Sequence, residues 1–534
     1  MPAELRRAVP RLSPLQAQLL FNRGLLPNGT DPDALERFLA PRWDTGLYDP
    51  FLLQDMERAV ERILTAIDRQ EPVGVFGHYD ADGLTATVLL TEVLSRLGAR
   101  AIPYIPSRSE EYGVNEAGIV ALARQNVRLL VSVDCGIRSF DAPATAAKFG
   151  MDVIITDHHT VLRYEGRDVL PEAYAVINPM RADCPYPCKS LSGVGVAFKL
   201  AHALLTRYAE RHGNGAKPHL AKWLLDLVSI GTIADVVDVT GENRALVSLG
   251  LVVLRYAKRP GIRALMGVAG TPPNRVGVDE VGFQLAPRIN AAARIGSADT
   301  SLQLLFARDS STAGALAGEL ERLNRQRQQL VRDALDDIRT RYGDTLAERK
   351  AVVVSGPWAP GIIGLIAGRL ADEYNRPAVV IETNGGELLQ GSARSRPGFH
   401  IADALHECRH LLERYGGHAQ AAGFSLPAAH LEAFRQRLFA LADRDIPEEA
   451  LEPVLPIDAV LKPDDLTAEL VEEVRVLEPF GPGNPPPLFG MRDVRLASVQ
   501  RVGRDGAHLR LAVRRNERAL RAMGWRMGHL ADTL

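Results

Sequence analysis

The chain has 534 residues, of which 46% are hydrophobic and 24% charged, and its formal net charge is −2. This composition is typical of a globular protein with roughly three or four domains, and it excludes disordered, collagen-like and coiled-coil chains. Because 63 lysines and arginines balance 65 aspartates and glutamates, a polyanionic partner must bind local basic clusters rather than bulk charge. Four cysteines indicate no disulfide framework and therefore a reducing compartment, by default the cytoplasm. No apolar stretch reaches about 18 residues, so we expect neither a signal peptide nor a membrane-bound protein.

The first part of the chain predicts a helical cap followed by a parallel sheet. Residues 1–70 read as short helices separated by proline and glycine, ending in an amphipathic helix near 54–68. From Pro72, β-branched runs alternate with Ala/Leu-rich helices, which indicates βαβ units. The expected elements are strands at 73–76, 101–105, 129–133 and 152–156, with helices at 81–97 and 140–149.

The rest of the sequence predicts a helical region, a second α/β block and an all-β module. A mostly helical stretch over 192–307 precedes one long helix over 311–341, which suggests two bodies with a cleft between them. A smaller α/β block begins at Ala351, and a proline-rich, all-β module follows Pro447. In the α/β block we expect helices at 361–374, 401–415 and 429–443 and strands at 378–382 and 389–393; in the β module we expect strands at 454–460, 493–502 and 508–514.

Three of the expected parallel strands are followed directly by possible metal ligands. These residues, with a fourth position at the end of a buried helix, are His78, Asp80 and Asp82, then Asp134, then Asp157, His158 and His159, and finally Asp235. One aspartate before a helix is more often an N-cap than a ligand. Several carboxylates and imidazoles at one sheet edge would repel one another without cations, however, so the pattern predicts a divalent site. Mixed oxygen and nitrogen ligands suit Mn²⁺ and tolerate Mg²⁺.

The same residues lie in short motifs spread over about residues 70–510. The motifs are His78-Tyr-Asp-Ala-Asp-Gly83, Val133-Asp-Cys-Gly136, Asp157-His-His159, Leu191-Ser-Gly-Val-Gly-Val-Ala-Phe-Lys199, Gly231-Thr-Ile-Ala-Asp235, Pro287-Arg-Ile-Asn-Ala291, Gly391-Ser-Ala-Arg-Ser395, Gly416-Gly-His418 and Leu477-Glu-Pro-Phe-Gly-Pro-Gly-Asn484. In content and order they resemble the RecJ family of single-strand-specific DNA exonucleases, within the DHH phosphoesterase superfamily.

The resemblance implies a multidomain α/β fold around a DNA channel. A parallel-sheet DHH domain and a smaller α/β DHH-associated domain would be joined by the long helix, and a C-terminal oligonucleotide-binding (OB-like) β-barrel would follow. The expected boundaries are a helical cap over 1–70, the DHH domain with its helical part over 71–308, the connecting helix over 309–345, the DHH-associated domain over 346–445 and the OB-like module over 446–534. Because the chain stops at Leu534 soon after the strand at 508–514, we expect a truncated or reduced barrel.

The resemblance also implies roles for the site residues. Two Mn²⁺ or Mg²⁺ ions would be held by Asp80, Asp82, Asp134, His158 and Asp235, with Asp134 bridging them. His78 is a further candidate ligand, at a position where the family often has aspartate. His159 would face the scissile phosphate, and the catalytic set would comprise His159, Asp134 and Asp157.

A second set of residues forms candidate contacts to DNA phosphates. It comprises Arg108, Arg288, Asn290, Ser392, Arg394, Gly417 and His418. Glycine-rich backbone and guanidinium groups suit phosphate. Two alternatives remain open: Gly416 and Gly417 also fit a helix C-cap, and Arg288 also fits an ion pair with a buried acid.

Together these features predict a two-metal exonuclease. Two ions about 3.5 to 4 Å apart would activate a water and stabilise the leaving oxygen. The resemblance implies 5′-to-3′ hydrolysis of single-stranded DNA to 5′-mononucleotides in DNA repair and recombination, by a monomer that works with a helicase and a single-strand-binding protein. One alternative is a DHH phosphodiesterase acting on short oligoribonucleotides or cyclic dinucleotides, which the chain length and C-terminal module disfavour. The other is an inactive DHH scaffold in a replication or repair assembly, which the full ligand set disfavours.

Overall fold

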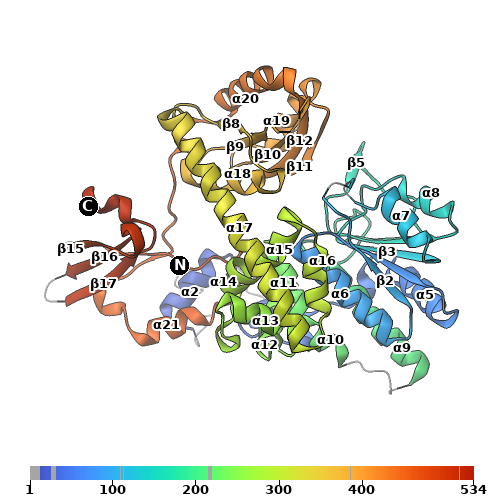
Figure 1. The fold of residues 1–534 in the computed structure, drawn as a ribbon. Coiled ribbons are helices and arrows are strands. Elements are labelled where there is room, and N and C mark those ends of the chain that lie inside the picture. Colours follow the sequence, from blue (N-terminus) through green and yellow to red (C-terminus); the bar gives the residue numbers. More distant parts are fainter. Residues whose placement is uncertain are drawn as a thin grey trace. The chain divides into compact units, whose positions relative to one another are not determined.

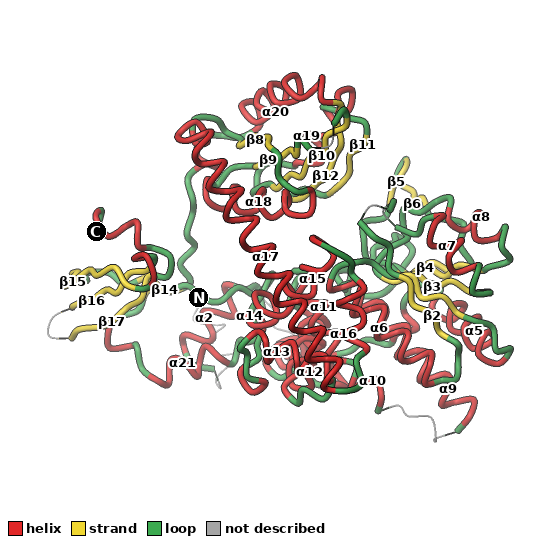
Figure 2. Tube along the Cα trace, viewed as in Figure 1, coloured by secondary structure: helices red, strands yellow, loops and turns green. Residues whose placement is uncertain are grey.

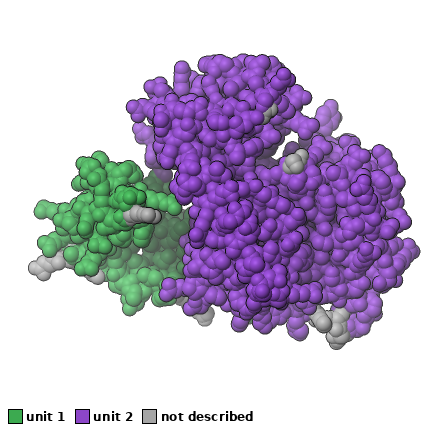
Figure 3. Space-filling model, viewed as in Figure 1, with its two compact units in different colours: residues 1–47, 238–249, 455–534 green, residues 48–237, 250–454 purple. Residues whose placement is uncertain are grey.

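The computed structural model describes residues 12–25, 32–108, 110–111, 113–213, 219–384, 386–515 and 518–534. The chain divides into two compact units, which Figure 3 distinguishes by colour. Unit 2 comprises Tyr48–Val237 and Gly250–Val454, and unit 1 combines Met1–Leu47, Asp238–Leu249 and Leu455–Leu534. The finer domain boundaries expected from the sequence stay predictions.

Unit 2 begins with a parallel sheet in the strand order β2-β1-β3-β4-β7. The strands are β1 (Val73–Phe76), β2 (Ala101–Tyr104), β3 (Leu129–Val133), β4 (Asp152–Thr156) and β7 (Ala175–Ile177). All but the three-residue β7 were predicted, and the fully buried β1 and β3 read as continuous apolar runs. The short hairpin β5 (Leu162–Tyr164) and β6 (Arg167–Val169) follows β4.

Helices cover both faces of this sheet (Figure 1). On one face α7 (Glu116–Ala123) and α8 (Ala142–Ala147) contribute to a shared apolar core. On the other face lie α5 (Met56–Asp68), α6 (Ala81–Arg96) and α9 (Gly193–His212). This arrangement confirms the predicted α/β domain and leaves the carboxyl ends of the strands for the site.

The next part of unit 2 is almost entirely helical, as predicted (Figure 2). Its helices are α10 (Leu220–Trp223), α11 (Leu225–Ala234), the end of α12 (Gly241–Arg255), α13 (Pro260–Ala269), α14 (Val278–Glu280), a π-helical turn over Val281–Leu285, α15 (Ala286–Ile295) and α16 (Asp299–Phe306). The part of α12 up to Leu249 belongs to unit 1. The long helix α17 (Ser310–Tyr342) then contacts α13, α15 and α16 along its first half. Further along, Ala334 and Ile338 enter the core of the second α/β domain, so one helix packs against both bodies.

The second α/β domain has a mixed sheet in the order β11-β12-β10-β9-β8. Its strands are β8 (Val352–Gly356), β9 (Ala378–Glu382), β10 (Leu388–Arg394), β11 (Arg414–Gly417) and β12 (Ala421–Pro427). Helix α18 (Pro360–Tyr374) packs with α17 on one face, whereas α19 (Ile401–Glu407) and α20 (Leu431–Asp445) cover the other.

Two expectations for this domain are wrong. The helix expected over 401–415 ends at Glu407, and Arg414–Gly417 instead pairs with β12 as an edge strand. Gly416 and Gly417 therefore lie in a strand, and the helix C-cap interpretation fails. The reason is tertiary: pairing with β12 outweighs the local helical pattern.

Unit 1 joins three separate stretches of sequence. Its elements are α2 (Pro14–Asn22), α3 (Pro32–Leu39), α4 (Trp43–Gly46), α21 (Ala468–Arg475), the pair β13 (Ala459–Val460) and β14 (Phe489–Gly490), and the antiparallel sheet β15 (Arg495–Val502), β16 (His508–Arg515) and β17 (Arg518–Gly524). The strand expected over 454–460 is reduced to β13, because Pro453 and Pro456 cannot donate ladder hydrogen bonds.

A buried arginine links these stretches. The Arg244 guanidinium donates to the carbonyl oxygens of Phe38 (2.7 Å), Glu478 (2.7 Å) and Pro479 (2.9 Å). Asn484 is also fully buried and donates to the carbonyls of Leu477 and Pro479. The motif over 477–484 thus holds unit 1 together. In neither unit does a described helix have the length and apolar character needed to cross a membrane.

Candidate metal centre and cationic cavity

The candidate metal ligands converge because β1, β3 and β4 are neighbouring parallel strands. Their carboxyl ends meet at one edge of the sheet. There the predicted residues form three overlapping groups of possible donors, each with donor atoms within 4.8 Å of one another. The groups are His78, Asp80 and Asp134; Asp82, His158 and Asp235; and Asp134, Asp157, His158 and His159.

Asp134 belongs to the first group and also faces His158 of the second group. Its Oδ2 is 3.6 Å from Nδ1 of His78, and its Oδ1 is 3.2 Å from Nε2 of His158. The backbone of Asp134 is left-handed (φ 59°), and its N–H donates to the carbonyl of Thr156. This turn directs the two carboxylate oxygens toward different imidazoles, as a residue shared by two ions requires.

The two aspartates of the first motif also have helix-capping roles. Asp80 is the N-cap of α6, where Oδ1 accepts from the Gly83 N–H (3.0 Å), while Oδ2 lies 3.0 Å from Nδ1 of His78. Asp82 accepts from the backbone N–H groups of Gly193 (2.6 Å) and Val194 (2.9 Å), at the positive end of α9. These bonds fix the orientation of both carboxylates before any ion binds.

Two glycines let neighbouring helices approach these carboxylates. A Cβ atom on Gly193 would lie 2.5 Å from Oδ1 of Asp134. A Cβ atom on Gly231 would lie 2.4 Å from Oγ1 of Thr85 and 2.7 Å from Oδ1 of Asp82. Both glycines belong to the quoted motifs, but their role follows only from this packing.

The electrostatics of the cluster suit a cation. Burial, reinforced by the charges of Asp134 and Asp235, raises the pKa of Asp82 well above its ordinary value. Burial likewise raises the pKa of Asp235 to about 7. Burial alone would lower the pKa of His158, yet Asp134 raises it well above its ordinary value. Crowded, buried carboxylates that resist ionisation together, with imidazole donors beside them, are the chemistry of a divalent metal site.

Asp157, a member of the third donor group, also positions the neighbouring His159. Its Oδ1 accepts from Nδ1 of His159 (2.7 Å), and Oδ2 accepts from the Ile137 N–H (2.9 Å). The bond to Nδ1 fixes the orientation of the His159 ring, with Nε2 on the side of the ring opposite Asp157. The rings of His159 and His418 lie 6.5 Å apart and nearly parallel, so the second α/β domain reaches the site at this histidine.

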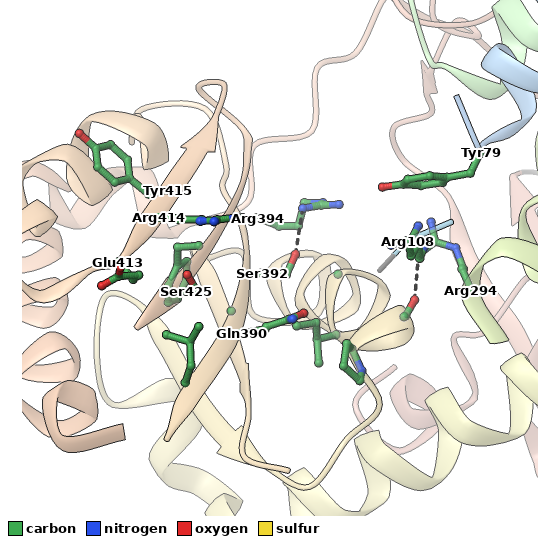
Figure 4. Close-up of a pocket in the computed structure, with 18 residues that line it drawn as sticks. Tyr79, Arg108, Arg294, Gln390, Ser392, Arg394, Glu413, Arg414, Tyr415 and Ser425 are labelled. Carbon is green, nitrogen blue, oxygen red and sulfur yellow. Dashed lines mark hydrogen bonds between the residues drawn. The ribbon is translucent and has the colours of Figure 1, made fainter. Parts of the chain in front are cut away.

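A cavity of about 820 Å³ lies in unit 2 between the two α/β domains. Figure 4 shows Ser392 and Arg394 on one side of it and Tyr79, Arg108 and Arg294 on the other. The Arg108 guanidinium lies 4.5 Å from the centre of the Tyr79 ring. With Arg414, four arginines line this cavity, and such a lining favours an anionic ligand such as a phosphate.

Arg294 was missed in the sequence, although it lies six positions after Arg288 on α15. It donates to the Gly361 carbonyl (3.1 Å) and lines the cavity. Burial, followed by the charge of Arg108, lowers the pKa of Arg294 to about 10. The available signal was the extension of the Pro287-to-Ala291 motif along the same helix.

The other predicted phosphate contacts lie outside the lining of this cavity. Arg288 pairs with Glu321 (2.7 Å) and donates to the Gln284 carbonyl (2.7 Å), which is the ion-pair alternative. Asn290 accepts from the Ala81 N–H (2.7 Å) and supports the first motif. Gly417 has φ 151° beside Ala421 and Ala422, next to His418. Contacts of these four residues with phosphate stay predictions.

Comparison with known families finds matches in three regions. Residues 72–232 match the DHH family N-terminal domain, residues 349–443 match the DHHA1 domain, and residues 457–534 match the RecJ OB domain. The matches follow the order of the bodies described above.

Similar proteins extend over nearly the whole chain. The single-stranded-DNA-specific exonuclease RecJ of Bacillus subtilis is 38% identical over 526 residues, covering 98% of this chain and 64% of that protein. The Escherichia coli protein of the same name is 34% identical over 530 residues, covering 96% and 87%. The chain thus spans just under two thirds of the Bacillus protein.

Solved structures of RecJ proteins are similar to this chain over nearly its whole length. The crystal structure of RecJ from Thermus thermophilus with Mn²⁺ has a TM-score of 0.81 and 32% identity, covering 98% of this chain and 72% of that one. The structure of RecJ from the same organism with Mg²⁺ has a TM-score of 0.75, also at 32% identity, and covers 98% and 71%.

Proposed function

Because this chain belongs to the RecJ family of single-stranded-DNA-specific exonucleases, we propose that it degrades single-stranded DNA from the 5′ end to 5′-mononucleotides with two Mn²⁺ or Mg²⁺ ions. The observation that carries the proposal is the position of Asp134, whose two oxygens face His78 and His158 in separate donor groups. An inactive scaffold would not need two complete groups of candidate metal ligands.

The first group (His78, Asp80, Asp134) and the second (Asp82, His158, Asp235) would each hold one ion, with Asp134 shared. When bound, the ions supply an activated water at neutral pH and stabilise charge on the leaving oxygen.

The chain's own residues orient the substrate. Asp157 holds His159 through Nδ1, so that Nε2–H of His159 donates to an oxygen of the scissile phosphate. His418, beside His159, lies where the second α/β domain would contact the same strand. Arg108, Arg294 and Arg394 would bind an adjacent phosphate in the cavity.

The C-terminal sheet supports binding of a long strand. Residues 491–534 contain ten arginines and no lysine against four acidic residues, although the whole chain is nearly neutral. Such a local excess binds a phosphate backbone without sequence preference. We propose the rest by family membership: action as a cytoplasmic monomer in repair and recombination, with a helicase and a single-strand-binding protein as partners.

Digestion of one oligonucleotide labelled at either end, with Mn²⁺, tests activity and polarity together. Release of the 5′ label as a mononucleotide in the first products supports the proposal, and early release of the 3′ label contradicts the polarity. Preferential cleavage of a two- to five-nucleotide RNA would indicate the short-oligonucleotide alternative. Arg394→Ala should slow digestion while leaving Mn²⁺ binding intact, and Arg409→Ala, which alters an exposed arginine, is the control.

A further inference from the structure

A second cavity, of about 980 Å³, lies in unit 2 away from the metal cluster. It is formed by the C-terminal end of α6, by α10 and α11, and by the segments that begin α13 and end α16. Figure 1 labels these helices. Arg96 on its wall is separated from Asp82 by most of α6, about 21 Å at 1.5 Å per residue. The cavity therefore takes no part in the proposed hydrolysis.

The lining of this cavity combines a group of leucines with charged side chains that pair with one another. Leu220, Leu224 and Leu305 line it and are buried. Arg259, Glu92 and Asp226 also line the cavity, where Arg259 is bonded to both oxygens of Glu92 (2.6 and 3.0 Å) and to Oδ2 of Asp226 (2.8 Å). These two acids are therefore already paired and do not neutralise the cations at the rim.

The rim is basic and aromatic. Arg96, Lys258 and Arg308 are exposed there, and none of the three forms an ion pair within the described ranges of the chain. Trp223 is 42% exposed, with the Lys258 ammonium 4.0 Å from its ring centre. Tyr256, 63% exposed, meets the Trp223 ring edge-on at 6.0 Å. Exposed aromatic residues beside an apolar pocket are typical of protein-binding surfaces.

From this chemistry we propose that the cavity docks a segment of a partner protein in which a bulky apolar side chain is flanked by carboxylates. The apolar side chain would enter between Leu220, Leu224 and Leu305, and the carboxylates would pair with Arg96, Lys258 and Arg308. The charge of the rim is complementary to such a segment. A nucleic acid fits less well, because Arg259, Glu92 and Asp226 are already bonded to one another and Lys258 already lies over the Trp223 ring, on which a base would stack.

Fluorescence anisotropy with labelled model peptides tests this docking on the full chain. One nonapeptide carries a single Phe among four Asp residues, a second has Asn in place of Asp, and a third has Ala in place of Phe. We expect the first peptide to bind at least about tenfold more tightly than either control. The Asn peptide lacks the carboxylates that pair with the rim, and the Ala peptide lacks the apolar side chain that enters the cavity. Trp223 fluorescence should change on binding.

Reversing the charge of a rim residue tests whether the peptide binds at this cavity. Lys258→Glu and Arg308→Glu should each weaken binding of the acidic peptide about tenfold, because a reversal removes one attraction and adds a repulsion. Arg124→Glu, at the exposed C-cap of α7 outside the cavity, should leave binding of the acidic peptide unchanged. All three variants should keep the exonuclease rate on a bare strand and the melting temperature of the parent.

Three results would overturn the proposal. The first is equal binding of the acidic and neutral peptides, which includes the absence of binding by either. The second is peptide binding that Lys258→Glu does not alter. The third is competition by an oligonucleotide whose own affinity falls in Lys258→Glu, which would identify a nucleic-acid surface instead. The unchanged rate on a bare strand keeps a failure here distinct from a failure of the proposed nuclease function.

Discussion

At the level of single residues, Asp134 has the most demanding position in the metal cluster. It combines a left-handed backbone with oxygens that face two imidazoles. Asn tolerates this backbone, so Asp134→Asn tests the charge without adding strain. We expect a loss of rate of at least about a thousandfold. Calorimetric titration should show fewer than two Mn²⁺ ions bound.

The matched control for this substitution is Asp141→Asn, at the start of α8, whose side chain makes no capping bond. It should retain both rate and ion binding. If Asp134→Asn keeps more than about a tenth of the rate with two ions bound, Asp134 does not bridge.

His202 on α9 provides a residue-level prediction about pH. Burial, followed by the charge of Lys199, lowers the pKa of His202 to about 4. In the unfolded chain His202 binds a proton near pH 6.5. The contribution of the neutral, buried His202 to the stability of the fold is therefore complete above pH 6.5 and is lost as the pH falls toward 4. At pH 5 the loss is about 2 kcal/mol. Thermal unfolding at pH 7.5 and 5.0 should show a smaller decrease for His202→Gln than for the parent. His410→Gln, on the surface, should behave like the parent, and equal decreases in all three proteins would refute the assignment.

At the level of elements, the start of α9 is a close contact that the site depends on. Gly193→Ala would place a methyl group 2.5 Å from Asp134 Oδ1. We expect the helix or the carboxylate to move, with loss of stability of about 1 to 3 kcal/mol and weaker Mn²⁺ binding. Gly195→Ala on the same helix meets only the Ser192 hydroxyl and Leu191 at 3.3 Å or more, so it is the control. Equal ion binding by both variants would show that this contact is not tight.

The segments of unit 1 depend on Arg244 in the same way. Arg244→Met keeps much of the volume but leaves three carbonyl oxygens without their donor. We expect unit 1 to be destabilised by about 3 kcal/mol or more. Limited proteolysis should cut residues within 455–534 sooner than in the parent. Arg475→Met, at an exposed ion pair in the same unit, should be cut like the parent, and equal cutting of both variants would mean that Arg244 does not hold unit 1 together.

For the whole molecule, the walls of the cationic cavity predict the form of the substrate. Arg394 comes from the second α/β domain, and Arg108 and Arg294 come from the first part of unit 2, so a strand must enter between them. A duplex must open before its end can enter such a space. At equal metal and salt, a blunt duplex should be digested at least about tenfold more slowly than its own separated strand. Comparable rates without a helicase would mean that the space is open to duplex DNA.

The sequence alone identified most of what lies close together along the chain. Strands buried on both faces and the periodic apolar residues of α17 depend on local patterns, so their bounds were predicted to within a few residues. The three strand ends carrying His78, Asp134 and His158 were also foreseeable, because parallel strands end at one edge.

Only the tertiary structure decided which distant groups share a contact. Asp235 lies beside Asp82 and His158 because α11 packs on α6, and Gly231 allows this packing because it has no Cβ atom. Arg288, a candidate for phosphate, is paired with Glu321, whereas Arg294 reaches the cavity from the same helix. Residues 414–417 became an edge strand through pairing with β12. In each case the local pattern allows more than one state, and the choice depends on the free energy of contacts with residues far away in the sequence.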